Sequence, residues 1–531
     1  MYWTAVPPLR DETHFGRAMR CFADRAPNLN AMFADTVARH RDREALVDGA
    51  QRLDYAKLDR VTERVAGHFH RLGLARGDRI ALYLGNEREF VHALLATLRL
   101  GAIAVPINVR EQRPELAFIL DQCGAKAIAF DAALADRLPA PADAPALSVR
   151  LSVGGAAPGA IAFDELLEAR SPEAPRADPA EEEPAVILYT SGTTGRPKGA
   201  VLTHLNVIHS VLHYGFCMRL TSADRSLLAV PASHVTGLVA ITLAMFAVGG
   251  CLVTLREFKA RAFLELAARE RMTHTLVVPA IYNLCLRDPD FGRFDLSAWR
   301  VGGFGGAPMP EGTIRALAER LPGLTLMNAY GATETTSPTT IMPMGRQAAN
   351  PDSVGAVVPC GDVKVMDDAG REVAPGEPGE LWIAGPMVVP GYWDNPEATA
   401  REFEGGYWKS GDLGSIDAAG FVRVFDRKKD MINRGGYKVY SAEVESVLSL
   451  HPLVVESALV AVPDPVLGEK THAFVVTRDG AAAELLRTHC AQHLADYKVP
   501  DFFTLRSEPL PRNANGKLLK RALRETPLDP G

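Results

Sequence analysis

The chain has 531 residues, of which 47% are hydrophobic and 23% are charged, a composition typical of a globular protein and not of a disordered one. Its length is too great for one ordinary domain, so we expect more than one. The formal net charge of -6 argues against a nucleic-acid partner, and anionic small molecules would have to be bound by local positive groups.

The first part of the chain alternates apolar runs with amphipathic stretches. An amphipathic stretch at residues 89–100, closed by Gly101, predicts a helix. Apolar runs predict strands at residues 79–84, 102–107 and 127–130. This alternation is typical of an α/β fold with parallel strands. Residues 171–184, rich in Ala, Pro and Glu, predict an exposed connection to the next strand.

A loop rich in glycines, hydroxyl groups and cations follows an apolar run at residues 185–189. The run predicts a buried strand, because it is continuously apolar rather than alternating. In the loop, glycines allow backbone N–H groups to approach phosphate oxygens, hydroxyls add donors, and Lys198 provides a mobile positive charge. The pattern predicts a polyphosphate site made by Thr190, Ser191, Gly192, Thr193, Thr194 and Lys198.

This loop has two other interpretations. It is not a Walker A loop, because Pro197 stands where the second glycine of that motif would be and Gly199 follows the lysine. A solvated surface turn remains the structural alternative, although so dense a mixture of glycines, hydroxyls and cations is unusual for one.

Residues 237–255 form an uncharged stretch just long enough to span a bilayer. Gly249 and Gly250 divide it, so an apolar helix at 237–248 followed by a short strand at 251–255 explains the same residues. We prefer this buried α/β unit and expect no integral membrane segment.

The cysteines and the chain ends give expectations about the compartment. Seven cysteines are scattered without a C-x-x-C pair or metal-ligand spacing, which predicts reduced, mostly buried thiols. Residues 1–20 lack the pattern of a secretory signal, and the last residues are neither a prenylation box nor a peroxisomal address. We expect a cytoplasmic protein, and the sequence leaves its oligomeric state open.

Six further segments accompany the phosphate loop, at residues 328–335, 379–386, 410–414, 426–430, 435–439 and 511–517. Together with residues 190–199 (TSGTTGRPKG) they resemble, in order, the motifs of the adenylate-forming enzymes. That family includes acyl-CoA synthetases, the adenylation domains of peptide synthetases and the luciferases. The resemblance covers nearly the whole chain.

The resemblance implies a division of the chain near Asp426, beyond which the sequence pattern also becomes shorter. Residues 1–426 would form a large region of stacked α/β sheets, and residues 427–531 a small, mobile α+β lid domain. Asp426 and Arg427 would act as the hinge, while Lys428 and Lys429 fit a solvated face better.

The resemblance also implies a reaction: ATP-dependent ligation of a carboxylic acid to coenzyme A through an acyl-AMP intermediate. The acid's carboxylate must attack a phosphate anion, so Mg²⁺ and cations are needed to neutralise charge. Glu334 would bind Mg²⁺ and Thr333 would contact the α-phosphate. Taken alone, Glu334 would be a helix-start carboxylate.

Asp412 and Arg427 would hold the ribose, since a carboxylate can accept hydrogen bonds from two hydroxyls. Ser410 replaces the usual threonine before Asp412, and the alternative for this aspartate is stabilisation of its own glycine-flanked turn. The nucleotide contacts implied by the resemblance are completed by Gly306, Ala307, Pro308, Asn328, Ala329 and Tyr330.

Lys517 is the residue implied as the catalytic cation. It follows a flexible Asn-Ala-Asn-Gly segment, from which its long side chain could reach the reacting carboxylate and α-phosphate. An isolated lysine near a C-terminus is otherwise only solubilising. In the same region Gly436 and Lys438 would line a coenzyme A channel in the loop 435–441, where Ser441 replaces the usual proline.

On the acyl side, His234 resembles the family residue beside the acid's carboxylate, with a satisfied core histidine as the alternative. Residues 301–308 would form the opposite wall of the pocket. They are not a dinucleotide fingerprint, because Pro308 occupies the third glycine position. The substrate-binding residues would be His234, Phe304, Gly305 and Gly331, and the alternative for Phe304 is a ring that turns away into the core.

No cation lies along residues 237–248, which favours a neutral acyl tail and a medium- or long-chain fatty acid over an aryl acid. An acyl-AMP ligase that loads a carrier protein is a second alternative, but no obvious extra insertion lies between Thr335 and Gly355. Two more distant alternatives are a luciferase-like oxygenase and a nucleotide-binding protein without catalytic activity. The inactive protein would be expected to have lost Lys517 or Glu334, and both are present.

Overall fold

The computed structural model describes residues 2–168, 176–190, 197–478, 482–512 and 518–526. Its contacts group the chain into two compact units. Unit 1 contains residues 1–308, 315–363 and 383–409, and unit 2 contains residues 309–314, 364–382 and 410–531. The hinge at Asp426 and Arg427 and the mobile lid stay predictions.

The first sheet of unit 1 has seven strands in the order β11-β10-β6-β5-β7-β8-β9. All neighbours are parallel except β10 and β11, which form an antiparallel pair. The bounds are β5 Arg79–Tyr83, β6 Ile103–Pro106, β7 Ala127–Asp131, β8 Val149–Val153, β9 Ile161–Ala162, β10 Pro184–Thr190 and β11 Lys198–Thr203. The strands predicted from apolar runs are therefore confirmed, including the buried strand before the phosphate loop.

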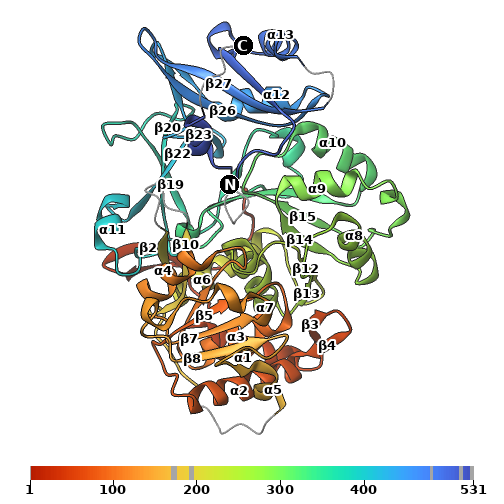
Figure 1. Cartoon of the computed structure of the whole chain (residues 1–531), viewed down its shortest axis with the longest axis vertical. Helices are drawn as coiled ribbons and strands as arrows, with labels where there is room; N and C mark the ends of the chain where they lie inside the picture. The colour runs from red at the N-terminus through yellow and green to blue at the C-terminus, as the bar shows by residue number, and fades with distance from the viewer. Residues whose placement is uncertain (1, 169–175, 191–196, 479–481, 513–517, 527–531) are drawn as a thin grey trace. The chain divides into compact units, whose positions relative to one another are not determined.

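Helices cover both faces of this sheet. Helix α3 (Arg88–Arg99) packs on β5 and β6 and confirms the helix predicted before Gly101, while α2 (Tyr55–Arg71) packs on α3. On the other face, α4 (Arg113–Gln122) contributes Leu116, Ile119 and Leu120 to a core shared with the strands. Two faces buried by helices explain why the strand sequences are apolar throughout. Helices α1 (Leu29–His40) and α5 (Phe163–Glu168) complete this part of unit 1 (Figure 1).

The second sheet region of unit 1 runs in the order β17-β16-β15-β14-β12-β13-β3-β4. Its central strands are parallel, β4 is an antiparallel edge strand, and β17 pairs antiparallel with β16 and with β18 (Gly355–Val357). The bounds are β3 Glu44–Asp48, β4 Gln51–Asp54, β12 Arg225–Leu228, β13 Cys251–Thr254, β14 His274–Val277, β15 Val301–Phe304, β16 Thr325–Tyr330 and β17 Thr340–Ile341. Helices α8 (Ala260–Arg269) and α9 (Pro279–Leu286) lie beside these strands (Figure 1).

The long apolar stretch folds as the buried unit that we preferred, with one difference. A π-helix, Thr236–Leu243, includes the start of the stretch, and α7 (Ala244–Val248) and strand β13 follow. The π-helix packs against α6 (His204–Cys217). None of the helices in the described part of the chain combines the length and the apolar composition that a membrane span requires.

Unit 2 contains an antiparallel sheet in the order β25-β24-β27-β26, with β28 parallel to β27. Its bounds are β24 Ile432–Arg434, β25 Tyr437–Val439, β26 Val454–Asp464, β27 Gly468–Thr477 and β28 Phe502–Arg506. Alternate strand residues face two separate cores, which helices α12 (Ser441–Ser449), α13 (Ala483–His493) and α14 (Lys520–Arg524) help to cover. This is the α+β architecture predicted for the C-terminal part.

All seven cysteines are buried and free, which confirms the predicted reduced thiols. Burial raises the pKa of each of them, for example that of Cys123 to about 11. These side chains therefore pack as small apolar groups and are poor nucleophiles.

Candidate active site

The two ends of the predicted phosphate loop lie next to each other at the edge of the first sheet. Thr190, the last residue of β10, pairs with Lys198, the first residue of β11. The Thr190 hydroxyl donates to the Lys198 carbonyl oxygen at 3.4 Å. Ser191, Gly192, Thr193 and Thr194 lie outside the described residues, so their phosphate contacts stay predictions.

Lys198 differs from the mobile cation that the sequence predicts. Its side chain is only 9% exposed, and its ammonium Nζ donates to both carboxylate oxygens of Glu402 at 2.6 Å. The same nitrogen lies 3.3 Å from the Tyr392 hydroxyl and 4.3 Å from the centre of that ring. The mobility that we expected for Lys198 is therefore wrong, because the half-buried Glu402 carboxylate holds the ammonium in place.

Glu334 lies in the same cluster. It belongs to a short 3₁₀ turn, Thr333–Thr335, and is buried. Its Oε1 accepts a hydrogen bond from the Tyr392 hydroxyl at 2.9 Å, and its backbone carbonyl accepts one from Val389 at 2.9 Å. Unit 1 therefore brings together Lys198, at the end of the phosphate loop, and the Glu334 carboxylate that is predicted to bind Mg²⁺.

Sequence reasoning missed both residues that make this connection, Tyr392 and Glu402. Tyr392 follows the predicted motif at residues 379–386 by a few positions and is 5% exposed, so an aromatic residue beside a motif was an available signal. Glu402 ends helix α11 (Pro396–Glu402), and nothing in the sequence distinguishes it from other helical glutamates.

Strands β15 and β16 place the predicted adenine and acyl segments side by side. The two strands are parallel, and Phe304 pairs with Asn328. The backbone of Gly305 lies so close to that of Ala329 that a Cβ atom on Gly305 would be 2.3 Å from the Ala329 carbonyl oxygen. A glycine is therefore required there by close backbone approach.

The remaining predicted residues of this edge are distributed around the turn. Gly306, Ala307, Pro308 and Gly331 are exposed, whereas Asn328 and Ala329 are buried and Tyr330 is half-buried. The backbone N–H of Asn328 donates to the side-chain oxygen of Gln347 at 3.2 Å, which anchors this part of β16. The exposed turn and the strand ends thus form one surface at the carboxyl ends of parallel strands, where ligands of such sheets commonly bind.

His234 and Phe304 have opposite environments. His234 is exposed just before the π-helix, and its Nδ1 accepts a hydrogen bond from the Thr236 backbone N–H at 3.3 Å. The alternative of a core histidine is therefore wrong. Phe304 is 1% exposed and is among the largest fully buried side chains, so its ring is part of a packed wall.

In unit 2, the structure brings Asp412 and Arg427 together. They pair across the antiparallel strands β22 (Tyr407–Ile416) and β23 (Phe421–Arg427), with Arg427 Nε 2.6 Å from Asp412 Oδ1. Asp412 therefore lies within a strand, and our interpretation of its surroundings as a turn is wrong. Ser410 is placed by its hydroxyl, which donates to the Leu381 carbonyl oxygen at 2.6 Å.

Asp426, Gly436 and Lys438 lie nearby in the sequence and also in unit 2. The Asp426 carboxylate accepts from the backbone N–H of Arg427 at 2.8 Å and from that of Ser441, the first residue of α12. A carboxylate at a helix N-terminus satisfies a backbone donor that has no partner within the helix. Gly436 and Lys438 are exposed in the β24–β25 hairpin. Lys517 lies outside the described residues.

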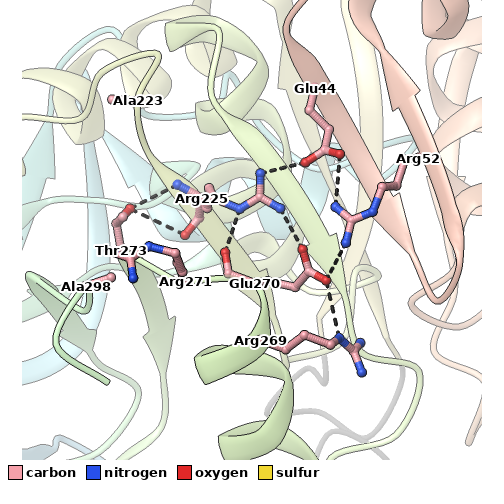
Figure 2. Close-up of a pocket in the computed structure, with 9 residues that line it drawn as sticks. All are labelled: Glu44, Arg52, Ala223, Arg225, Arg269, Glu270, Arg271, Thr273 and Ala298. Carbon is pink, nitrogen blue, oxygen red and sulfur yellow. Dashed lines mark hydrogen bonds and ion pairs between the residues drawn. The ribbon is translucent and has the colours of Figure 1, made fainter. Parts of the chain in front are cut away.

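A cavity among the described residues of unit 1 lies away from this site. It has a volume of about 450 Å³ and lies within unit 1 at the amino ends of strands β3, β12 and β14, the opposite ends of the parallel strands from Phe304 and Asn328. Figure 2 shows that Arg225 lies between two glutamates, Glu44 and Glu270, at 2.6 and 2.7 Å. The arginines that line this cavity are largely paired with glutamates. We therefore interpret the lining as a structural ion-pair network.

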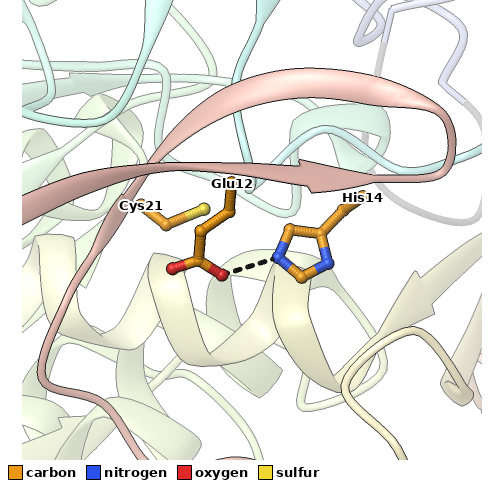
Figure 3. A group of neighbouring side chains, drawn as sticks. All are labelled: Glu12, His14 and Cys21. Carbon is orange, nitrogen blue, oxygen red and sulfur yellow. Dashed lines mark hydrogen bonds and ion pairs between the residues drawn. The ribbon is translucent and has the colours of Figure 1, made fainter.

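A second cluster, of Glu12, His14 and Cys21, has ligand types that suit a metal (Figure 3). Both Glu12 oxygens already accept from Arg25 at 2.7 Å, and this guanidinium holds the pKa of the Glu12 carboxyl well below its usual range. Burial raises the pKa of the Cys21 thiol to about 12. A cation there would meet an arginine and a protonated thiol, so the cluster does not fit a metal site.

Comparison with known proteins places the chain in a family. The sequence matches the AMP-binding enzyme family over residues 33–393 and the AMP-binding enzyme C-terminal domain over residues 443–517. The long-chain-fatty-acid–CoA ligase FadD13 of Mycobacterium tuberculosis is 35% identical over 89% of this chain and 93% of the ligase. A feruloyl-CoA synthase of Amycolatopsis sp is 34% identical over 90% of this chain and 95% of the synthase.

Solved structures agree with these relatives. The o-succinylbenzoate CoA synthetase of Bacillus subtilis, in complex with the acyl-adenylate OSB-AMP, is similar with a TM-score of 0.85 and 28% identity, covering 95% of this chain and 99% of that chain. The same enzyme in complex with ATP and magnesium ion gives a TM-score of 0.84 and 29% identity, covering 94% and 100%. The chain therefore belongs to the AMP-binding enzyme family, the adenylate-forming enzymes that its motifs predict, and within it to the acyl-CoA synthetase branch.

Proposed function

We propose that the chain is an ATP-dependent acid–CoA ligase that works in two steps. In the first, the carboxylate of an acid attacks the α-phosphorus of ATP, giving acyl-AMP and releasing pyrophosphate. In the second, the thiol of coenzyme A attacks the acyl carbon, a thioester forms and AMP leaves. Because adenylate is a good leaving group, the site must exclude water while acyl-AMP is present.

The observation that carries this proposal is the link between the phosphate loop and Glu334. Lys198 Nζ lies 3.3 Å from the Tyr392 hydroxyl, and that hydroxyl donates to Glu334 at 2.9 Å. An anion that attacks a phosphate needs both a cradle for the polyphosphate and a carboxylate for a divalent cation. The cluster of Lys198, Tyr392 and Glu334 supports both the polyphosphate cradle and the carboxylate for the cation.

Glu334 fits a magnesium ion. Mg²⁺ prefers hard oxygen donors and usually takes one or two carboxylates together with substrate phosphates. Tyr392 holds one oxygen of Glu334, which fixes the orientation of the carboxylate. When bound, Mg²⁺ would neutralise phosphate charge, and Thr333, one residue earlier in the same turn, would bind the α-phosphate.

The other predicted residues keep their proposed roles. The turn of Gly306, Ala307 and Pro308, with the β16 residues Asn328, Ala329 and Tyr330, would enclose adenine, and Asp412 with Arg427 would bind the ribose. Their pairing at 2.6 Å supports a joint role in unit 2. Exposure of Gly436 and Lys438 is compatible with a coenzyme A channel in the lid, and exposure of His234 with a contact to the acid's carboxylate.

For the acid, we propose a medium- or long-chain fatty acid. The π-helix and α7 expose almost no polar surface, and Leu238, Val239 and Ile241 are fully buried. The similarity to a long-chain-fatty-acid–CoA ligase supports this choice, and the nearly equal similarity to a feruloyl-CoA synthase supports an aryl acid as the alternative.

Pyrophosphate release tests the proposal with a panel of fatty and aryl acids, each with and without coenzyme A. A ligase releases pyrophosphate with its preferred acid, and coenzyme A converts the acyl-AMP to a thioester with continued turnover. An acyl-AMP ligase for a carrier protein would stop at acyl-AMP in both arms. No release with any acid would contradict the proposed function.

Replacing Phe304 with glycine is expected to move the preferred acid towards longer or bulkier chains. The buried ring occupies space directly before the turn that would face the acyl group. Each methylene that enters the space gained would contribute about 0.8 kcal/mol at most. The measurement is kcat/KM against chain length for the wild type and Phe304→Gly.

Phe304→Leu is the matched control, since it keeps most of the apolar volume and should shift the optimum little. A profile that falls equally for all acids would show that Phe304 stabilises the fold and that chain length is set elsewhere.

A further inference from the structure

Glu402 connects the phosphate loop to the proposed magnesium ligand although it lies outside the seven motif segments described above. Its two oxygens accept from the Lys198 ammonium at 2.6 Å each. Its Oε2 also lies 2.5 Å from the Tyr392 hydroxyl, which is in turn 2.9 Å from Glu334 Oε1. A chain of direct contacts therefore runs from Lys198 through Glu402 and Tyr392 to Glu334.

This chain of contacts is largely withdrawn from water. Lys198 and Tyr392 are 8% and 5% exposed, and Glu334 is 7% exposed. Burial would raise the pKa of the Glu402 carboxyl, but hydrogen bonds from Lys198 and Tyr392 outweigh it and lower that pKa. The carboxylate is thus charged and paired, and charge-assisted hydrogen bonds of this kind are strong and directional.

The hydrogen bonds must be shared in a particular way. A tyrosine hydroxyl has one proton, yet the Tyr392 hydroxyl lies within hydrogen-bond distance of two carboxylates, those of Glu402 and Glu334. The Lys198 ammonium already donates to both oxygens of Glu402. The two carboxylates share this one proton, and the contact of 2.5 Å to Glu402 is shorter than that of 2.9 Å to Glu334, so the Tyr392 hydroxyl is held between them.

We propose that Glu402 is a positioning residue for the adenylation site, which holds Lys198 and, through Tyr392, fixes the Glu334 carboxylate for the magnesium–ATP complex. This inference rests on the proposed function, in which Glu334 takes Mg²⁺. It goes further, because it assigns a role to Tyr392 and Glu402. It also implies that the Lys198 ammonium is held by Glu402 and is not mobile. A residue that orients a metal ligand typically changes metal affinity by about 10- to 100-fold when it is replaced.

The test compares Glu402→Gln, Tyr392→Phe and the double variant. The first keeps the shape of Glu402 but removes its charge, and the second removes only the hydroxyl. We expect each single variant to raise the Mg²⁺ concentration for half-maximal pyrophosphate release by about 10-fold or more. The double variant should be no worse than Tyr392→Phe, because the effect of Glu402 on Glu334 passes through Tyr392.

Binding of Mn²⁺ in the presence of ATP, followed by electron paramagnetic resonance, gives a second readout that needs no acid and no turnover. The affinity for Mn²⁺ should fall in all three variants, in the same order as the Mg²⁺ dependence of pyrophosphate release. Glu397→Gln is the matched control, because Glu397 lies exposed in the first turn of the same helix, α11. It should change neither the Mg²⁺ dependence nor the Mn²⁺ affinity.

Each outcome decides the proposal. Unchanged metal affinity in Glu402→Gln would show that Glu402 and Lys198 form only a structural ion pair, and additive effects in the double variant would show that Glu402 does not act through Tyr392. If Glu402→Gln does not fold, Tyr392→Phe alone decides, since a buried tyrosine and phenylalanine pack similarly. A wild type that binds Mn²⁺ with ATP but activates no acid would contradict the proposed function, and the variants would still report on Glu402.

Discussion

Replacing Lys517 with alanine is expected to abolish acyl-AMP formation and to leave thioester formation from supplied acyl-AMP largely intact. Negative charge develops on the α-phosphate and the bridging oxygen only in the first step, and a positioned cation there stabilises it. Removing one such group typically costs about 100- to 1,000-fold in rate. Lys517 lies outside the described residues, so this prediction rests on the motif at residues 511–517.

The measurement separates the two half-reactions. Exchange of labelled pyrophosphate into ATP reports the first, and formation of acyl-CoA from synthetic acyl-AMP reports the second. Lys429→Ala is the control, because Lys429 is an exposed lysine of the same unit and belongs to the basic run that the sequence predicts to be solvated. An equal loss in both half-reactions would show that Lys517 supports the fold or the lid and not the adenylation step.

Elements with a strong local signal could be predicted from the sequence. Strand β10 is continuously apolar because both of its faces are covered, and α3 combines an amphipathic pattern with a glycine at its end. The motif segments at β15 and β16 could be assigned to one site because they occur together in a family. Their register, with Phe304 opposite Asn328, needed the structure.

Other features depend on partners far away in the sequence. Lys198 looks like a free cation until Glu402, on helix α11, is placed beside it. Asp412 looks like a turn residue because glycines flank it, but pairing of β22 with β23 extends the strand through it. Long-range ion pairs and strand pairing leave no periodic trace in the local sequence, so neither could be derived from it.

The π-helix at Thr236–Leu243 shows a different limit. An α-helix and a π-helix differ by one residue in their hydrogen-bond register, and a periodic pattern would be needed to distinguish them. Here every residue of the segment after Thr236 is buried, so the pattern carries no periodicity. The sequence could predict a buried helix but not its hydrogen-bond pattern.

Replacing Asp412 is expected to weaken ATP binding more than any other single change in unit 2 among the described residues. In the proposed site its carboxylate accepts two charge-assisted hydrogen bonds from the ribose, worth on the order of 2 to 4 kcal/mol in total, or about 30- to 1,000-fold in Kd. Asp412→Asn is the preferred variant, because alanine would also leave a space beside Arg427.

Asp417→Asn is the matched control for this change. Asp417 pairs with Arg423 at 2.7 Å, just as Asp412 pairs with Arg427 at 2.6 Å, and both pairs join the same two strands or their connection. Loss of an aspartate–arginine pair therefore affects stability in both variants, but only Asp412 belongs to the nucleotide motif. Calorimetric titration with ATP should show a large loss of affinity in Asp412→Asn and little in Asp417→Asn. Equal ATP affinity in the two variants would mean that Asp412 serves only to join β22 to β23, and that the ribose is held by other residues.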